Sequence, residues 1–438
     1  HWILACILAL SLAFTFPSCS DGSSGSSDDE QTALPTYTVT LDANGGNLGE
    51  LQNITEVAGT EITLPAGTAF TQDGFDYIFA GWNTKPNATG KNYAAGEKIT
   101  LTSNITLYSK WGLTAEDALK KIQSITESGV HTVSIVGNVA DCIAKTDRDT
   151  LSQMQEALWA LQQSYPDARI ILDLSGTDDL TAVPADAFNG RSKFNCENLS
   201  GIILPQSVKS IGSYAFNMCI NLVDVVLPKT LDSVGNYAFL CCYSLTEIVI
   251  PEGVSELGII FDFCTSLKNV SLPSSLRKLT STFYNCSSLE KIVIPEGVET
   301  LGYSVFYNCS SLVDITLPST LKEFEEQPIF GESLAFFSCK SLKNIVIPDG
   351  VTKLSTALFY ECSSLESITI PASVTEISRG AFGLCTNLKT VNYKGTKSDW
   401  EAISIDTRNS SDEENANIAL SRATIICTDG RIEPTTGE

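Results

Sequence analysis

A cysteine recurs every 22 or 23 residues through the second half of the chain. The series stands at positions 196, 219, 242, 264, 286, 309, 339, 362 and 385, with a single interval of 30 residues. Three residues after each cysteine comes a leucine, which in seven units opens a short alternating segment that ends in proline: NLVDVVLP, SLTEIVIP, SLKNVSLP, SLEKIVIP, SLVDITLP, SLKNIVIP and SLESITIP. A period in the low twenties with a strand in every unit predicts a solenoid, because one such unit cannot bury its apolar side without neighbours.

The alternation within a unit predicts which side chains enter the core. In the unit that opens at Leu222, Val225 and Leu227 are expected to point inward, whereas Asp224 and Val226 are expected to face solvent. Stacking the units aligns these segments into one parallel sheet. Proline ends each strand because it lacks the N–H that a ladder needs.

The repeated pattern, approximately VxxIGxxAFxxCxxLxxIxIPxS, closely resembles the BspA-type leucine-rich repeats of treponemal and Bacteroidetes-like surface proteins. The resemblance implies a right-handed leucine-rich repeat solenoid over residues 181–427, with the parallel sheet on its concave face and a C-terminal cap around Trp400. A short tail would follow at 428–438. The resemblance further implies adhesion, that is, attachment to host matrix proteins, host cell-surface proteins or other bacteria.

Residues 36–111 have the composition of a small sheet, with alternating strands separated by glycine turns. The phrases YTVTLDANGG, FAGWNT and LTSNITLYSKW carry the pattern. They resemble the Listeria-Bacteroides repeat domain, the β-grasp-like module of the internalin B-repeat. That resemblance implies a stalk or interaction domain without catalytic residues.

Residues 112–180 predict a short α/β cap of two helices and two strands. Thr114 and Asp117 have the spacing of a helix N-cap, and the helix should stop before Gly129. A strand at 133–136, a helix around 150–163 and a strand at 170–174 should follow. The unit would cover the open end of the solenoid.

The first residues predict export. An uncharged apolar run ends at Cys19, and a Ser-, Gly- and Asp-rich segment follows. Residues 1–19 resemble a bacterial lipoprotein signal, which implies acylation of Cys19, a flexible linker over 20–35 and an outer-membrane or cell-surface location. Cleavage elsewhere is the alternative. A membrane-spanning helix is disfavoured, since about 15 apolar residues fall short of the roughly 20 required.

Composition and spacing argue against several kinds of site. The formal charge of -23 repels nucleic acid. One cysteine per coil spreads thiols along a line rather than around a metal, so we expect no metal and no cofactor. Disulfides between adjacent coils are harder to exclude, but parallel Cβ vectors favour buried, reduced thiols. Cys142, Cys241 and Cys427 lie outside the series.

An enzyme is not expected. Beyond the first residue the only histidine is His131, which we predict to be an exposed residue at a strand boundary. Motifs alone do not exclude a carbohydrate-active enzyme that uses paired carboxylates.

The candidate binding surface is the outward side of the long sheet. Its middle row is predicted to contain Ile203, Val226, Val249, Ser271, Val293, Thr316, Val346, Thr369 and Asn392. Charges of both signs flank it at Asp224, Glu247, Lys268, Glu290, Lys291, Asp314, Lys343 and Glu366. Mixed charge favours a protein partner, although β-branched residues also suit an unoccupied sheet.

A second candidate is the insertion in the long coil, expected at 325–331. An apolar tip lies within an acidic rim there, formed by Glu325, Glu326, Pro328, Ile329 and Phe330. It is either a contact loop or a loop that buries its phenylalanine.

We expect a monomer that attaches to the membrane only through its lipid, either as a surface adhesin or as an envelope or periplasmic scaffold with bacterial partners.

Overall fold

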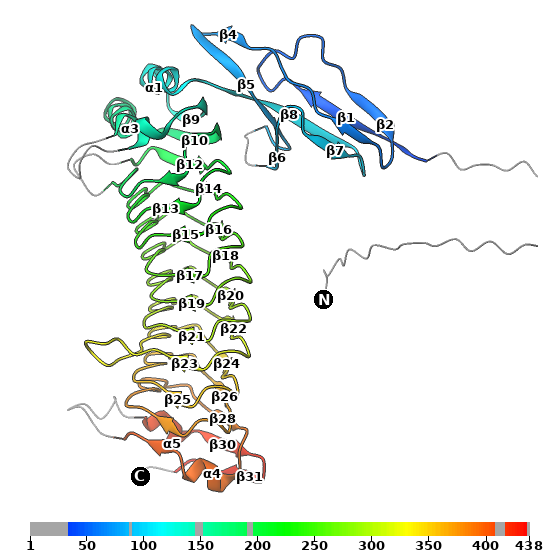
Figure 1. Cartoon of the computed structure of the whole chain (residues 1–438). Coiled ribbons are helices and arrows are strands. Elements are labelled where there is room, and N and C mark those ends of the chain that lie inside the picture. The colour runs from blue at the N-terminus through cyan, green and yellow to red at the C-terminus, as the bar shows by residue number, and fades with distance from the viewer. Residues whose placement is uncertain (1–33, 87–89, 145–151, 191–195, 408–416, 436–438) are drawn as a thin grey trace, which may run out of the picture.

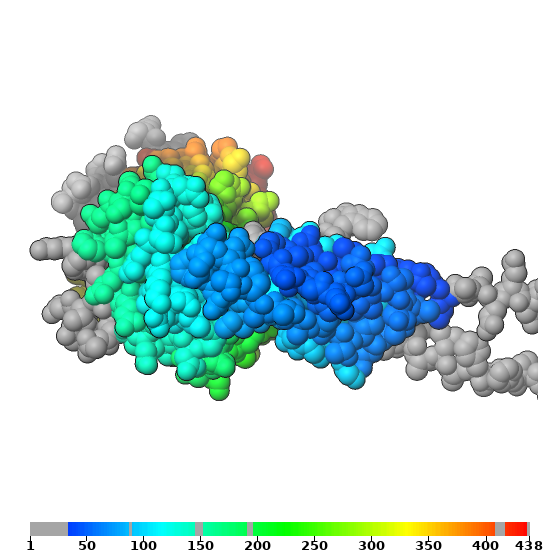
Figure 2. All heavy atoms as spheres, turned by 90° about the horizontal axis from the view of Figure 1, so that it is seen from above, coloured from blue at the N-terminus to red at the C-terminus, as the bar shows by residue number. Residues whose placement is uncertain are grey.

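The computed structural model describes residues 34–86, 90–144, 152–190, 196–407 and 417–435. Figure 1 shows a long stack of coils with a small domain projecting sideways from its N-terminal end. Viewed from above, this domain extends well beyond the outline of the stack (Figure 2). The predicted signal, Cys19 and all but two residues of the predicted linker lie outside the described residues.

The N-terminal domain is built on a mixed sheet with the strand order β2-β1-β8-β5-β4 and with β6 beside β5. Strands β1 and β8 are parallel, whereas the other pairs are antiparallel. Trp82 is fully buried and donates a hydrogen bond from its indole nitrogen to the Pro65 carbonyl, 2.7 Å away. The strands are β1 Thr36–Asp42, β2 Ile54–Val57, β4 Phe70–Gln72, β5 Phe75–Asn83, β6 Asn92–Tyr93 and β8 Ile105–Gly112, with β3 Glu61–Thr63 paired to β7 Lys98–Thr100.

The next segment has the helix and strand order expected of the cap, with one additional short helix. Thr114 accepts a hydrogen bond from the Asp117 backbone, and Ser152 and Gln155 form a capping box, so both longer helices begin at polar caps. The elements are α1 Ala115–Ser124, β9 Gly129–Gly137, α2 Ala140–Ile143, α3 Gln153–Ser164 and β10 Ala168–Thr177. Strands β9 and β10 are parallel and begin the sheet that the coils continue.

One side of the stacked coils is formed by parallel strands that continue from β9 and β10. We call this side the main sheet. Its strands after β10 are β12 Leu199–Ile203, β14 Asp224–Val226, β16 Glu247–Val249, β18 Asn269–Ser271, β20 Lys291–Val293, β22 Asp314–Thr316, β24 Asn344–Val346, β26 Ser367–Ile370, β28 Thr390–Tyr393 and β30 Thr424–Cys427. Its hydrogen-bonded ladder is interrupted after β14, β18 and β22. These three strands precede Leu-Pro, whereas β16, β20 and β24 precede Ile-Pro.

A second parallel ladder runs along the coils, which the sequence did not predict. Its two-residue strands are β11 Ala182–Val183, β13 Ser210–Ile211, β15 Ser233–Val234, β17 Glu256–Leu257, β19 Lys278–Leu279, β21 Thr300–Leu301, β23 Glu323–Phe324, β25 Lys353–Leu354, β27 Glu376–Ile377 and β29 Ser404–Ile405. We call this surface the second sheet. A glycine follows several of these strands; a Cβ on Gly235 would lie 2.5 Å from the Ser213 backbone nitrogen, so adjacent coils require a residue without a side chain there.

The core of the coils consists of repeated side-chain columns. One phenylalanine per coil stacks on the next with ring centroids 5.2–5.9 Å apart, from Phe188 to Phe382. From Cys219 to Cys385, the recurring cysteine of each coil donates its thiol to the phenylalanine carbonyl of the preceding coil, as Cys309 does to Phe283 at 3.1 Å. The prediction of buried, reduced thiols is confirmed for this series, whose members are all free and buried.

Two positions in most coils have left-handed backbone. Non-glycine examples four residues apart are Tyr214 and Met218, Tyr237 and Cys241, Ser281 and Asn285, Ser304 and Asn308, Leu334 and Ser338, and Ala357 and Glu361. Such a conformation costs non-glycine residues roughly 1 kcal/mol each, and the stacked core of phenylalanine and cysteine holds it in place.

The last coil is closed by short elements. Helix α4 Lys397–Glu401 buries Trp400, and Ala419 and Leu420 of α5 Ile418–Arg422 join the same core. Strand β31 Gly430–Ile432 pairs antiparallel with β30, so part of the segment expected to be a tail continues the sheet.

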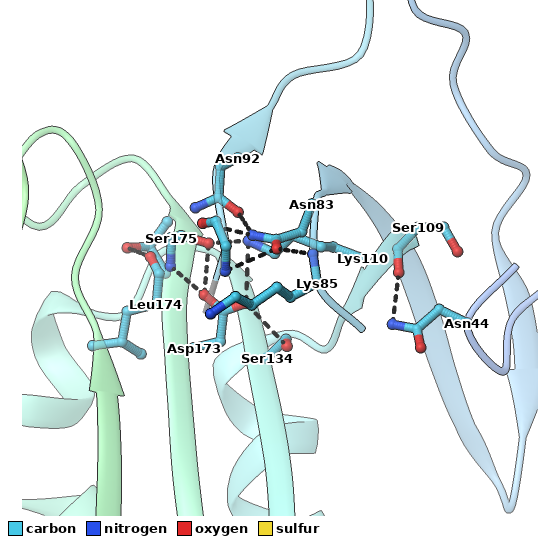
Figure 3. A network of polar contacts seen from close by, with 12 residues as sticks. Asn44, Asn83, Lys85, Asn92, Ser109, Lys110, Ser134, Asp173, Leu174 and Ser175 are labelled. Carbon is cyan, nitrogen blue, oxygen red and sulfur yellow. Dashed lines mark hydrogen bonds and ion pairs between the residues drawn. The ribbon is translucent and has the colours of Figure 1, made fainter. Parts of the chain in front are cut away.

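A buried polar network joins the N-terminal domain to the coils (Figure 3). Lys110 of β8 forms an ion pair with Asp173 of β10 at 3.1 Å and also contacts the Ser175 hydroxyl. The Ser175 hydroxyl donates to the other oxygen of Asp173 at 2.6 Å. Directly after β8, Leu113 bridges Ile135 of β9 in parallel. The N-terminal domain is therefore held against the first strands of the main sheet by an ion pair and by a backbone bridge.

Candidate binding surface

The residues of the predicted middle row lie on successive strands of the main sheet, in segments that are separated where the ladder is interrupted after β14, β18 and β22. The strand register pairs Ile203 with Val226, Val249 with Ser271 and Val346 with Thr369. Val249, Val293 and Val346 are 66%, 65% and 59% exposed, so these valines offer an apolar stripe to solvent. The register continues the row to Ile426, which is 45% exposed and which the sequence did not place there.

The N-terminal end of the row differs from the prediction. Ile203 is buried rather than exposed, and Val226 is half-buried. Ile203 pairs with Asp173, the residue that Lys110 covers from the N-terminal domain. Two predicted core residues, Val225 and Leu227, are only half-buried. The available part of the row therefore begins at Val249.

The predicted flanking charges are all exposed. Within the described part of the chain, seven of the eight form no ion pair; these are Asp224, Glu247, Lys268, Glu290, Lys291, Asp314 and Lys343. Glu366 alone pairs, with Lys389 at 3.5 Å. Charges of both signs thus remain available beside the apolar stripe.

Several charges on and beside the second sheet form ion pairs, unlike most of those on the main sheet, although Glu256 and Glu323 form none within the described residues. Lys322 pairs with Glu299 at 2.8 Å, and Lys353 pairs with both Glu326 and Glu376 at 3.3 Å. A partner would have to break these contacts before it could use the same charges. Within the described residues, the main sheet therefore keeps more of its charges unpaired than the second sheet does.

The insertion in the long coil projects from the second sheet (Figure 1). Ion pairs fix its base, with Glu325 to Lys278 at 2.8 Å and Glu326 to Lys353. Ile329 and Phe330 at its tip are 81% and 70% exposed. The alternative in which the loop buries its phenylalanine is therefore wrong, and Pro328 beside the tip is exposed as well.

Among the described residues, no group of three or more His, Cys, Asp or Glu side chains is placed to hold a metal ion. His131 lies within β9 rather than before it, is half-buried, and has its Nε2 3.2 Å from the Glu127 carbonyl oxygen. The expectation of an exposed boundary histidine is thus corrected to a partly buried strand residue. Cys142 is half-buried and donates its thiol to Gln153.

Helices long and apolar enough to cross a bilayer are not found within the described ranges.

Stacked coils with parallel ladders and a buried leucine column define a leucine-rich repeat protein. Residues 181–282 and 280–402 match the BspA type leucine rich repeat region in six copies, about half of the chain. The chain belongs to this family. Residues 37–110 match the Listeria-Bacteroides repeat domain. Both modules are typical of bacterial surface proteins and are non-catalytic, which indicates a role in protein binding or adhesion.

Several solved structures are similar to the chain. A leucine-rich repeat protein from Bacteroides ovatus is 31% identical over 52% of this chain and 57% of its own, with a TM-score of 0.44. The T. pallidum leucine rich repeat protein is 25% identical over 50% and 77%, with a TM-score of 0.29. A leucine rich cell surface protein from Faecalibacterium prausnitzii is 21% identical over 78% and 99%, with a TM-score of 0.26. The chain thus spans 57% of the Bacteroides ovatus protein. No curated protein matches it significantly.

Proposed function

We propose that the chain is an exported surface lipoprotein, acylated at Cys19, that attaches the cell to a protein partner through the main sheet. The partner is a host matrix or cell-surface protein, or a protein on another bacterium. In this proposal the main sheet is the concave side of a right-handed solenoid and the β-grasp-like N-terminal domain is a spacer. The chain acts as a monomer and uses no cofactor.

The contrast between the two sheets carries the proposal. Lys291 and Asp314 lie opposite each other in the register of β20 and β22, yet neither forms an ion pair with any residue that the structure describes. Unpaired charged side chains beside exposed valines favour the electrostatic steering of a protein partner toward the main sheet. They also favour specific charge pairing with that partner. Their mixed sign, together with the chain's charge of -23, disfavours nucleic acid as the ligand.

Exposure and anchoring are tested on intact cells. Protease added outside should digest the full-length protein, and Cys19→Ala should release it from the membrane fraction. The opposite result is a protein that resists protease on intact cells and is digested once the cells are permeabilised. That result would overturn surface exposure and would favour a periplasmic scaffold with bacterial partners.

Binding is tested with the purified chain on a panel of immobilised extracellular-matrix proteins and on whole bacteria. Reversal of main-sheet charge in Asp314→Lys or Lys343→Glu should weaken saturable binding about tenfold, equivalent to about 1.4 kcal/mol. The matched control is Glu256→Lys, an exposed residue of the second sheet. Equal effects from both sheets would contradict the assignment of the binding surface.

A further inference from the structure

A depression of about 490 Å³ opens on the main sheet around Ser271. Ser271 lies in the middle row between Val249 and Val293, and its side chain has one heavy atom fewer than the valine side chains on either side. Strands β18 and β20 are not joined by a hydrogen-bonded ladder at this point, although each pairs with its other neighbour. The surface of the middle row is therefore lower at Ser271 than at the valines on either side of it.

The walls of the depression are apolar. Val249 and Val293 are each about two-thirds exposed, and the half-buried Leu272 and Pro295 complete the lining. Burying such walls under a partner's side chain removes apolar surface from water, and fully desolvated pockets of this kind carry much of the energy of protein interfaces.

The rim of the depression has one charge of each sign. Glu247 stands at the first position of β16, Lys291 at the first position of β20, and the neutral Asn269 between them. Two strand spacings separate the charged residues, roughly 10 Å. Neither forms an ion pair in the part of the chain that the structure describes. Both are thus available to a partner that fills the depression.

We propose that this depression seats an aliphatic or aromatic side chain of a polypeptide partner. A basic side chain of the partner pairs with Glu247, and an acidic one pairs with Lys291. The inference rests on the proposed function, in which the main sheet binds protein, and names the anchor point on that sheet. It also fixes the order of the partner's charges, with the basic group toward the N-terminal coils.

The probe is a phage-displayed library of random 12-residue peptides, selected on the full chain. Selected peptides should converge on a central apolar residue with Lys or Arg on one side and Asp or Glu on the other. Ser271→Trp fills the depression and should weaken their binding at least tenfold. Thr369→Trp, in the same row on β26, is the matched control and should leave binding unchanged, with thermal unfolding used to confirm that both variants fold.

The charge order gives a second readout. The double variant Glu247→Lys/Lys291→Glu should reject these peptides and select peptides with the reverse charge placement relative to the sheet. Peptides without an apolar and charged consensus, or equal affinity for Ser271→Trp and the unchanged chain, would overturn the proposal. If Ser271→Trp retains matrix-protein binding while Asp314→Lys loses it, the proposed function stands and this anchor point fails. If the protein is not exposed on cells but the peptides behave as expected, surface attachment fails and the anchor point stands.

Discussion

Lys110 Nζ lies 3.1 Å from Asp173 Oδ2, and this ion pair fastens the N-terminal domain to the coils. The two side chains are 4% and 0% exposed. Removing one charge from such a pair leaves the other buried without compensation, which is more costly than the pair itself is stabilising.

Lys110→Met should therefore lower the free energy of unfolding by about 3–5 kcal/mol in a denaturant titration. The matched control is Lys98→Met, because Lys98 pairs with Glu61 at 2.8 Å on the exposed surface of the same domain; its cost should be below about 1 kcal/mol. Lys110→Met/Asp173→Leu should regain most of the loss. Similar costs for Lys110→Met and Lys98→Met would show that the junction is not a buried polar contact.

The cysteine column should resist thiol reagents in the folded protein. Burial raises the pKa of the Cys385 thiol to about 12, and the same cause raises the pKa of the Cys309 thiol further, so almost no thiolate forms at neutral pH. Iodoacetamide followed by mass spectrometry should modify the half-buried Cys241 in native protein and every cysteine after denaturation. Native labelling of Cys309 at the rate of Cys241 would contradict the burial of the column.

The loop tip should matter for binding and not for folding. Phe330→Ser should change the free energy of unfolding by less than about 0.5 kcal/mol, because the ring is already 70% exposed. Phe336→Ser, at a fully buried ring in the same coil, should cost about 3–5 kcal/mol. We propose the loop as a second contact in addition to the main sheet, so Phe330→Ser should weaken binding to the same matrix protein, whereas Glu256→Lys, on the second sheet but outside the loop, should not. Unchanged affinity would remove the loop from the binding surface.

Asp262 should make stability fall as pH rises from acid to neutral. Burial raises the pKa of this carboxyl to about 7, and its Oδ1 has no hydrogen-bond partner among the described residues. Because the folded state holds the proton more tightly than the unfolded chain, whose value is near 3.8, stability is complete below the unfolded pKa and declines until about pH 7.

Asp262→Asn should remove this decline and stabilise the protein above pH 7 by on the order of 2 kcal/mol, allowing for the partial exposure of the side chain. Denaturant titrations at acid and neutral pH measure the difference, with the exposed Asp224→Asn as the control. A variant whose stability follows the same pH curve as the unchanged protein would exclude Asp262 as its source.

The coils were predictable because each is specified locally and then repeated. Each unit repeats the same leucine and isoleucine positions, the proline after the strand and, in several units, the Ala-Phe pair. The structure of one unit therefore predicts the structure of the next. The second sheet was missed because two residues such as Ser233 and Val234 carry too little alternation to indicate a strand. Its geometry comes from stacking, which no single unit reveals.

The candidate surface was predictable in outline and not in its electrostatics. Sequence alternation placed Val249 and Lys291 on the outside, where the structure has them. It did not show that Lys353 is neutralised by Glu326, 27 residues away, while Lys291 remains free. The burial of Ile203 likewise depends on its place at the domain junction, which is set by tertiary contacts.

The hydrogen bond from each cysteine to the phenylalanine carbonyl of the coil before it makes neighbouring units interchangeable. A gene that gains or loses one repeat of 22 or 23 codons keeps every such bond in register and leaves both ends of the protein as they were. Each such event changes the span of the main sheet by about 4.8 Å. The reach of this surface therefore depends on the number of units and changes in fixed steps.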